Sequence, residues 1–179
     1  GLENNPAIKA KCDWATKYMN SKCDIATKIF AFALVEGLLF QSSFCAIFYM
    51  KKRGLLPGLS FANQLISRDE GLHFKFAAYI YNEYCDKLPI EKENEIIKEA
   101  VKLSKDFATE SLPVDLIGMN SNTMKQYIEF VADYLLYDLS KRKLYNQKNP
   151  YDWMDLISLQ GKTNFFDLRV AEYQKSKVG

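Results

Sequence analysis

Glu70 and His73 are three residues apart, and His73 is the only histidine in this chain of 179 residues. On a helix, residues three apart lie on one face about a turn from each other, so this carboxylate and this imidazole could reach the same metal ion. A Glu-x-x-His pair that faces inward on a bundle helix is the half-site from which carboxylate di-iron centres are built. The spacing alone is a weak indication, because most such pairs lie on solvated faces.

The pair belongs to a longer stripe with helical spacing. Its members follow one another at intervals of four, three, four and three residues: Ile66, Glu70, His73, Ala77 and Ile80. The stripe is apolar at both ends and carries the potential ligands in its middle, so it predicts that Glu70 and His73 face a core. We expect one helix over residues 60–84, with Ser60 as its N-cap.

A third potential ligand, Glu36, lies near the middle of a run of apolar residues at 29–50. The run is long enough to span a bilayer, and basic residues follow it at 51–53, as on a cytoplasmic flank. A carboxylate at the bilayer centre is costly, however, and an apolar helix is equally expected at the centre of a soluble bundle. We therefore predict a central helix from Ile25 to Met50, with Asp24 as a candidate N-cap, in a soluble protein.

The carboxylate of Glu36 needs an explanation, because an ionised carboxylate is rarely buried unless it is paired or coordinates a metal. Glu36 could bind a metal, pair with an arginine or be protonated. Phe40 and Phe44 follow it on the same helix face, either as ordinary core residues or as aromatic walls that keep water away. A short connection at 54–58, with Gly54 as a candidate C-cap of the preceding helix, would let Glu36 meet Glu70.

Asp69 precedes Glu70 and lies four residues before His73, at the edge of the potential ligand face. Carboxylates that orient metal-bound histidines are common in metal sites. The alternative is that Asp69 pairs with Arg68 or another cation on the surface. The local sequence favours neither interpretation.

The bulk composition narrows the class of protein. The formal net charge is only +2, which gives no indication of binding to nucleic acid or to an anionic membrane. Four cysteines without CxxC spacing are expected to be reduced packing residues of a cytosolic protein. No signal or transit peptide is recognisable. The length fits one domain. The first residue is Gly1 and not an initiator methionine, which suggests a piece of a longer protein.

Three more helices are expected, and no segment alternates with period two for long enough to predict a sheet. Their expected limits are Pro6 to about Asn20, residues 91–110 before Pro113, and Asn122, as the N-cap, to Leu139 or beyond. On the first of them, the apolar stripe is Ile8, Cys12, Ala15 and Met19, with Trp14 beside it. The predicted fold class is therefore all-α.

Several motifs closely resemble the small, radical-generating subunit of eukaryotic class I ribonucleotide reductase. They lie at residues 33–37, 44–49, 51–59, 66–73, 117–120, 124–133 and 161–166. The resemblance covers nearly the whole chain, in order and with the right spacings. It implies a ferritin-like helical bundle that encloses two irons, each held by carboxylates and one histidine.

The resemblance also implies roles for individual residues. Glu36, Glu70 and His73 match the iron ligands of the second half of the site. Asp69 matches the aspartate that hydrogen-bonds the histidine on the other iron, within the electron and proton route toward the partner subunit. Apolar residues around the radical tyrosine are matched by Phe40, Phe44 and Ile66.

The sequence departs from the family pattern by a large absence. The ligands of the first half, the radical tyrosine and the transfer tryptophan would precede Gly1, and no second Glu-x-x-His occurs here. The C-terminal tail that docks on the large subunit would begin just beyond residues 172–174, yet the sequence stops at Gly179. We therefore expect residues 1–179 to form a single ferritin-like domain that is incomplete at its N-terminus, lacks the tail, holds three of six ligands and is inactive alone.

The intact protein is expected to be an oxidoreductase subunit of ribonucleoside-diphosphate reductase. It would use two irons and oxygen to generate a tyrosyl radical, which a large catalytic subunit would use to reduce ribonucleotides. The resemblance implies a cytoplasmic homodimer that binds the large subunit but neither nucleic acid nor membrane. The alternatives are another ferritin-like di-iron protein, such as a ferroxidase or oxygenase, and a metal-free helical scaffold in which Glu36 and Glu70 are salt-bridged.

Overall fold

The computed structural model of this chain describes residues 5–20, 22–111, 114–117 and 119–154. Its elements, in chain order, are α1 (Pro6–Met19), α2 (Ile25–Leu34), the π-helical segment η2 (Val35–Leu39), α3 (Gln41–Lys52), α4 (Pro57–Tyr84), α5 (Ile90–Asp106), the π-helical segment η3 (Phe107–Ser111), the 3-10 segment η4 (Val114–Ile117) and α6 (Ser121–Ser140). The described part of the chain contains no strand, which confirms the all-α prediction.

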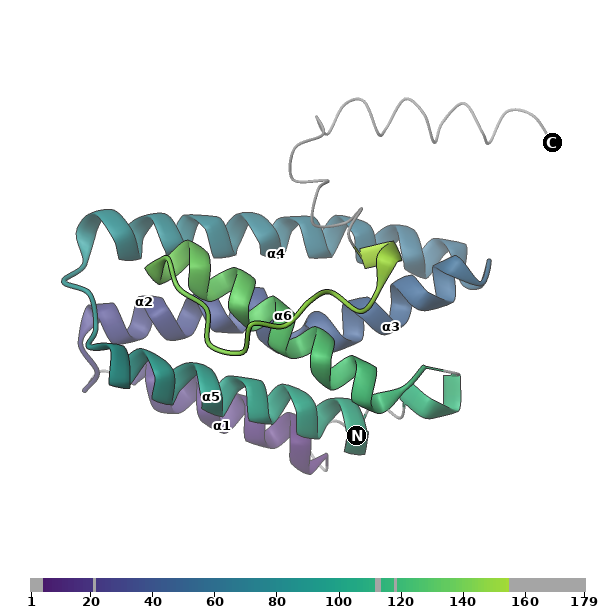
Figure 1. The fold of residues 1–179 in the computed structure, drawn as a ribbon, viewed down its shortest axis with the longest axis horizontal. Coiled ribbons are helices and arrows are strands. Elements are labelled where there is room, and N and C mark those ends of the chain that lie inside the picture. The colour runs from purple at the N-terminus through teal and green to yellow at the C-terminus, as the bar shows by residue number, and fades with distance from the viewer. Residues whose placement is uncertain (1–4, 21, 112–113, 118, 155–179) are drawn as a thin grey trace, which may run out of the picture.

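The helices form a bundle in which α4 runs along most of the length (Figure 1). Helices α2 and α3 follow each other beside it and both contact it, while α1 and α5 pack together on the far side of α2 (Figure 1). Helix α6 contacts α3, α4 and α5. The helical run Ile25–Lys52, which contains the apolar residues 29–50, thus lies between neighbouring helices. Of its most apolar stretch of 18 residues, 61% is buried. By length and composition it is the one helical run in the described residues that could cross a membrane, and its burial is that of a soluble core helix.

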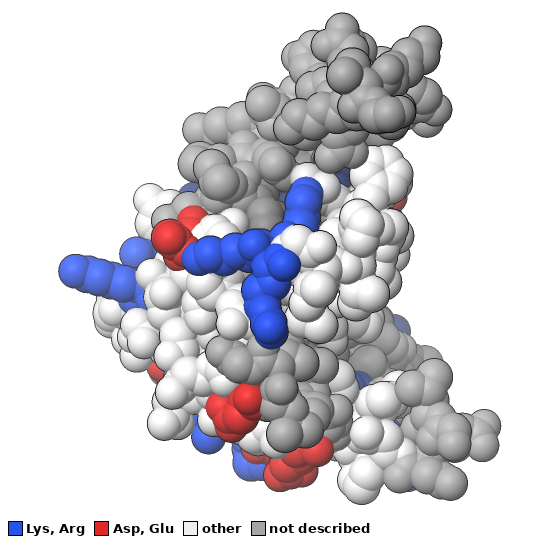
Figure 2. Space-filling model, turned by 90° about the vertical axis from the view of Figure 1, so that its right-hand side faces the viewer, with Lys and Arg blue, Asp and Glu red and all other residues white. Residues whose placement is uncertain are grey.

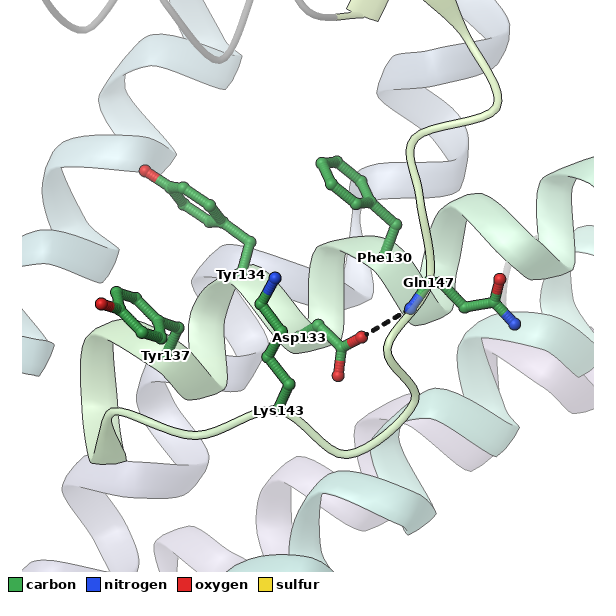
Figure 3. Close-up of a pocket in the computed structure, with 6 residues that line it drawn as sticks. All are labelled: Phe130, Asp133, Tyr134, Tyr137, Lys143 and Gln147. Atoms are coloured by element: carbon green, nitrogen blue, oxygen red, sulfur yellow. Dashed lines mark hydrogen bonds between the residues drawn. The ribbon is translucent and has the colours of Figure 1, made fainter.

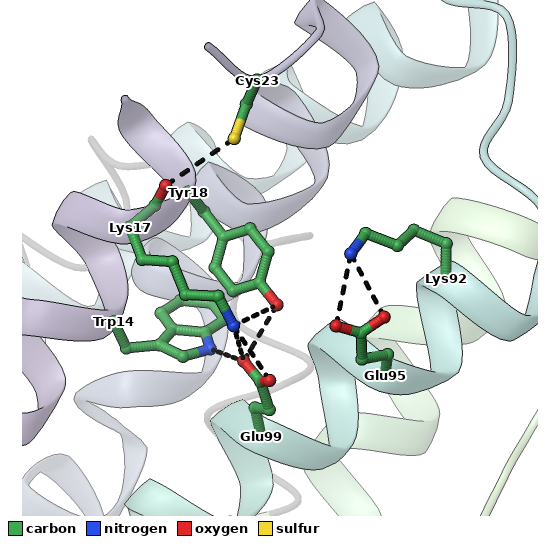
Figure 4. A network of polar contacts seen from close by, with 7 residues as sticks. All are labelled: Trp14, Lys17, Tyr18, Cys23, Lys92, Glu95 and Glu99. Carbon is green, nitrogen blue, oxygen red and sulfur yellow. Dashed lines mark hydrogen bonds and ion pairs between the residues drawn. The ribbon is translucent and has the colours of Figure 1, made fainter. Parts of the chain in front are cut away.

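Helix α1 begins at Pro6 as predicted, but the predicted apolar stripe is wrong at two of its four positions. Cys12 and Met19 are exposed, whereas Trp14 and Tyr18 are buried and pack edge to face with ring centroids 5.0 Å apart. Glu99 of α5 accepts hydrogen bonds from Trp14 Nε1 at 3.0 Å and from the Tyr18 hydroxyl at 2.9 Å (Figure 4). The larger rings bury more apolar surface than the aliphatic stripe would, and their polar tips have an acceptor.

The connection between α3 and α4 follows the predicted C-cap but not the predicted N-cap. Gly54 has a φ of 73°, and its N–H donates to the Lys51 carbonyl at 2.9 Å, which closes the end of α3. Helix α4 starts at Pro57, whose fixed φ suits the first helical position, so Ser60 does not cap it. The Ser60 N–H already donates to the Leu56 carbonyl at 2.9 Å, as in a helix interior.

Basic side chains gather on the end of the molecule shown in Figure 2. Helix α3 ends with Lys51 and Lys52, and positive charge is favourable at the C-terminal end of a helix. Lys51 donates to the Gln64 side chain at 2.8 Å, and Lys52 lies 3.5 Å from an Asp152 oxygen. Lys51 and Lys52 thus have polar partners within the fold.

Helix α6 is capped by Asn120 and not, as predicted, by Asn122. The backbone of Asn120 is extended, and its side chain accepts a hydrogen bond from the Thr123 N–H at 3.0 Å. Asn122 already lies inside the helix, so its side chain cannot serve the first turn in this way. Pro113, the predicted end signal for the helix at residues 91–110, lies outside the described residues.

Glu93 is, together with Asp133, the most deeply buried acidic residue among those described, at 2% exposure. One carboxylate oxygen accepts from the Tyr81 hydroxyl at 2.7 Å and the Ser140 hydroxyl at 2.6 Å. The other accepts from Arg142 Nη2 at 2.6 Å and Nε at 3.2 Å. The cluster fastens α4, α5 and the end of α6 to one another. Sequence reasoning missed it, because a charged stretch at 91–98 is typical of a solvated face.

Candidate metal centre

Three potential ligands converge from two helical elements. Glu36 comes from η2, and Glu70 and His73 come from α4. His73 Nδ1 lies 3.0 Å from Glu36 Oε2 and 3.1 Å from Glu70 Oε2. One ligand atom from each residue lies within 4.8 Å of the other two, a spacing that lets three donors contact one ion. These are the side chains singled out from the sequence.

The local structure around Glu36 is a π-helical turn, which sequence reasoning missed. Such turns are rare and often occur at functional sites. Gly37, the next residue, lets η2 approach its neighbours closely. A Cβ atom there would lie 2.8 Å from Leu135 Cδ2 of α6 and 3.1 Å from Phe74 Cδ2 of α4. The missing side chain therefore brings Glu36 close to the potential ligands on α4.

Gly37→Ala is expected to lower the free energy of unfolding by about 1–3 kcal/mol, because the added methyl group overpacks a filled core against Leu135. Gly71→Ala is the matched control in α4, where a Cβ would meet nothing within 4 Å. That change should stabilise by about 0.5–1 kcal/mol, as alanine does relative to glycine in a helix. Urea denaturation of both variants measures the difference. Equal effects of the two substitutions would contradict the close approach at Gly37.

The site is open on one side. The Glu36 and Glu70 side chains are 15% and 21% exposed, whereas the His73 side chain is 57% exposed. Burial and the hydrogen bond with Glu70 raise the pKa of Glu36, although His73 acts in the opposite direction. Hydrogen bonds to Glu36 and Glu70 raise the pKa of His73. The metal-free site therefore retains protons, and a metal ion must displace them before it binds.

Glu36→Gln is expected to lower the pKa of His73, because the substitution removes the carboxylate that is the largest cause of its elevation. NMR titration of the single histidine measures this without assignment ambiguity. Since the folded-state pKa is raised, the contact stabilises the fold below the unfolded pKa, and this contribution disappears as the pH rises through the folded pKa. The control is Glu83→Gln, because Glu83 lies on α4, the helix of His73, about 15 Å further along it than His73. An unchanged His73 pKa in Glu36→Gln would refute the contact.

The other predicted site residues lie outside the converging group. Phe44 is buried, but Phe40, whose ring centroid lies 6.5 Å from that of Phe44, is 43% exposed. Ile66 is 50% exposed and the His73 side chain is 57% exposed, so the prediction that the stripe on α4 faces a core is wrong at these two residues. Asp69 is exposed and contributes no atom to the group of three. The pocket and relay roles of these residues stay predictions.

A separate cavity of about 360 Å³ lies between α6 and the segment that follows it (Figure 3). Its lining residues are Phe130, Asp133, Tyr134, Tyr137, Lys143 and Gln147. The Asp133 carboxylate accepts hydrogen bonds from the backbone N–H groups of Leu144 at 2.7 Å, Tyr145 at 2.8 Å and Gln147 at 3.0 Å. This carboxylate therefore holds the returning segment against α6 and is not available as a ligand.

The sequence matches the family model described as "Ribonucleotide reductase, small chain" over residues 1–150. It is 54% identical over 177 residues to a ribonucleoside-diphosphate reductase small chain of Arabidopsis thaliana, and the match covers 99% of this sequence and 52% of that protein. It is 58% identical over 177 residues to the small chain of Plasmodium falciparum (isolate Dd2), with 99% and 51% covered. The sequence thus spans about half the length of these relatives.

Solved structures show the same arrangement of helices. The ribonucleotide reductase Rnr4 homodimer from Saccharomyces cerevisiae superimposes with a TM-score of 0.80 at 32% identity, over 96% of this sequence and 52% of that one. A putative class I ribonucleotide reductase from Bacillus halodurans gives a TM-score of 0.76 at 22% identity, over 87% and 61%. The second likeness concerns the fold alone.

Proposed function

Because this chain belongs to the ribonucleotide reductase small-chain family, we propose that it supplies one half of the di-iron site of a ribonucleoside-diphosphate reductase small subunit. The fold is the ferritin-like helical bundle of that family. One observation carries the proposal: Glu36, Glu70 and His73 bring their ligand atoms within 4.8 Å of one another.

The three residues fit a metal ion by their chemistry. Two carboxylates and one imidazole are donors that suit iron or manganese. They reproduce half of the ferritin-like ligand set, a Glu from one helix and a Glu-x-x-His from another. Two carboxylates that meet at one imidazole repel each other, and a cation between them would relieve the repulsion. The family implies a metal cofactor, and we propose iron.

Each residue then has a task in the intact protein. Glu36 and Glu70 supply the negative charge that holds the cation, and His73 supplies a neutral nitrogen once its proton has left. When bound, two irons would activate oxygen, which could then oxidise a tyrosine of the intact subunit to a radical. We propose that Asp69 then moves a proton and orients a histidine of the other ligand half on the route to the large subunit.

The remaining proposed contributions concern the surroundings of the radical and the assembly. Phe40, Phe44 and Ile66 carry no polar side-chain atoms, so they would exclude water from the radical tyrosine. We propose that the intact subunit is a cytoplasmic homodimer that binds a large catalytic subunit, and the yeast relative was solved as a homodimer. Residues 1–179 would form part of its single ferritin-like domain, inactive alone.

The proposal is tested on a complete small subunit that contains these residues. Loading with Fe²⁺ and exposure to oxygen should give two irons per subunit and a low-temperature EPR signal of a tyrosyl radical. Bound iron without a radical would favour a ferroxidase or oxygenase. Failure to bind any metal would overturn the proposal in favour of a helical scaffold.

A further inference from the structure

Lys11 of α1 is a partly buried cation that the metal site does not use directly. Its ammonium group donates a hydrogen bond to the backbone carbonyl of Leu39 at 2.5 Å, across 28 residues of sequence. The same nitrogen lies 3.7 Å from the centre of the Phe107 ring. Leu39 is the last residue of η2, and Phe107 is the first residue of η3. One side chain therefore contacts both π-helical segments found among the described residues.

The environment of Lys11 is unusual for a lysine. Within the part of the chain that the structure describes, its contacts are a neutral carbonyl and an aromatic ring, and neither carries a negative charge. Burial lowers the pKa of Lys11 to about 8, so the charged form is disfavoured relative to water. A buried cation is costly, and it is retained where its hydrogen bond and its ring contact offset that cost. The bond to Leu39 is therefore a specific structural contact.

The end of η2 is a sensitive position because Glu36 lies in the same five-residue segment. An α-helix advances about 100° per residue, so a turn that gains or loses one residue rotates everything before it by that angle against everything after it. If η2 relaxed to an α-helical turn, Glu36 would rotate relative to α3. It could then no longer face both Glu70 and His73 while α3 kept its packing.

We propose that Lys11 is a positioning residue for Glu36: its ammonium group, bonded to the Leu39 carbonyl, keeps η2 in the π-helical register that directs Glu36 toward Glu70 and His73. The inference rests on the proposed function, because it treats Glu36 as a metal ligand. Lys11 acts from the side of the bundle opposite α4, through the backbone of η2. It touches neither the metal ligands nor their side chains.

Lys11→Met tests the proposal, since methionine keeps an unbranched apolar stem and removes the donor. Lys9→Met is the matched control, because Lys9 lies on the exposed side of α1 and pairs with Asp13 at 2.5 Å. In the metal-free protein, amide hydrogen exchange over residues 36–44 should accelerate about tenfold in Lys11→Met, whereas the α6 core stays as in the wild type. Lys9→Met should exchange as the wild type does.

The second measurement is the affinity for Mn²⁺, followed by EPR of the free ion. Lys11→Met should bind Mn²⁺ about tenfold more weakly than the wild type, the size of effect found for residues that orient ligands. Lys11→Arg, which keeps a cationic donor, should recover most of the affinity. Faster exchange with unchanged Mn²⁺ affinity would show that Lys11 only stabilises the helix. Unchanged exchange would show that the contact with Leu39 does not stabilise η2. Either result overturns the proposal.

The outcomes also separate this proposal from the proposed function. If the wild-type protein binds no Mn²⁺, the metal site fails, and the NMR ring signals of His73 decide the role of Lys11. The chemical shifts of the His73 ring should change in Lys11→Met, because the Glu36 carboxylate moves away from the imidazole. Unchanged chemical shifts would overturn the inference. Should Lys11→Met fail to fold, Lys11→Gln takes its place with the same expected direction in each measurement.

Discussion

Glu93→Ala is expected to lower the free energy of unfolding by about 3–5 kcal/mol, the range found when one partner of a buried ion pair is removed. The substitution leaves the guanidinium group of Arg142 without its carboxylate in a half-buried position. The hydroxyl groups of Tyr81 and Ser140 lose their acceptor in the same step. Three elements that meet at this carboxylate would therefore loosen together. Urea denaturation followed by circular dichroism measures the change.

The matched control is Glu95→Ala, two residues further along α5. Glu95 pairs with Lys92 at 3.1 Å on the surface, and exposed pairs contribute about 0–1 kcal/mol. The two substitutions remove the same side chain from the same helix, so they differ in burial and partners. A loss of stability in Glu93→Ala no greater than in Glu95→Ala would show that the buried cluster does not hold the bundle together.

The largest expected effect on activity concerns Asp69 and Glu70, neighbours with different proposed tasks. In a complete small subunit, Asp69→Asn should fold and bind iron but reduce nucleotides with its large subunit about 10–100-fold more slowly. Asparagine keeps the shape of the side chain but loses its charge and its proton acceptor. Glu70→Ala should lose both metal and activity, because it removes a ligand. Iron content and nucleotide reduction, measured side by side, distinguish the two.

If Asp69 only lies on the surface, its replacement should be nearly silent, since exposed ion pairs contribute about 0–1 kcal/mol. Turnover at the wild-type rate in Asp69→Asn would therefore remove this residue from the radical route. The exposure of Asp69 is consistent with either role. Its proposed partner, a histidine of the other ligand half, does not occur among these 179 residues, where His73 is the only histidine.

The helices could be predicted from the sequence because their signals are local. Asp24 caps α2 as expected by accepting from the Thr27 N–H at 2.7 Å, and Gly54 ends α3 with a left-handed backbone. The errors arose where two signals competed. Ser60 is a good capping residue, but Pro57 three positions earlier suits a helix start better. Asn120 and Asn122 are the same residue type, and only the backbone conformation decides between them.

The convergence of the three side chains could be predicted, because periodicity alone places Glu70 and His73 on one face and the acidic Glu36 in an apolar run needs a partner. The π-helical turn and the glycine that direct Glu36 toward the other two side chains could not be predicted. A π-helical turn has no sequence signature of its own, and the value of Gly37 depends on where Leu135 of another helix lies. The Glu93–Arg142 pair joins residues 49 positions apart, and no local sequence pattern predicts a contact between residues so far apart in the chain.

The most direct test of the central claim is pulsed EPR of Mn²⁺ added to this protein. His73 is its only histidine, so a coupling between bound Mn²⁺ and an imidazole nitrogen can come from no other residue. We expect weak binding, because three ligands hold a metal less firmly than six, with a nitrogen coupling that disappears in His73→Ala. Bound Mn²⁺ that shows no imidazole coupling, or a coupling that survives the loss of His73, would contradict the account.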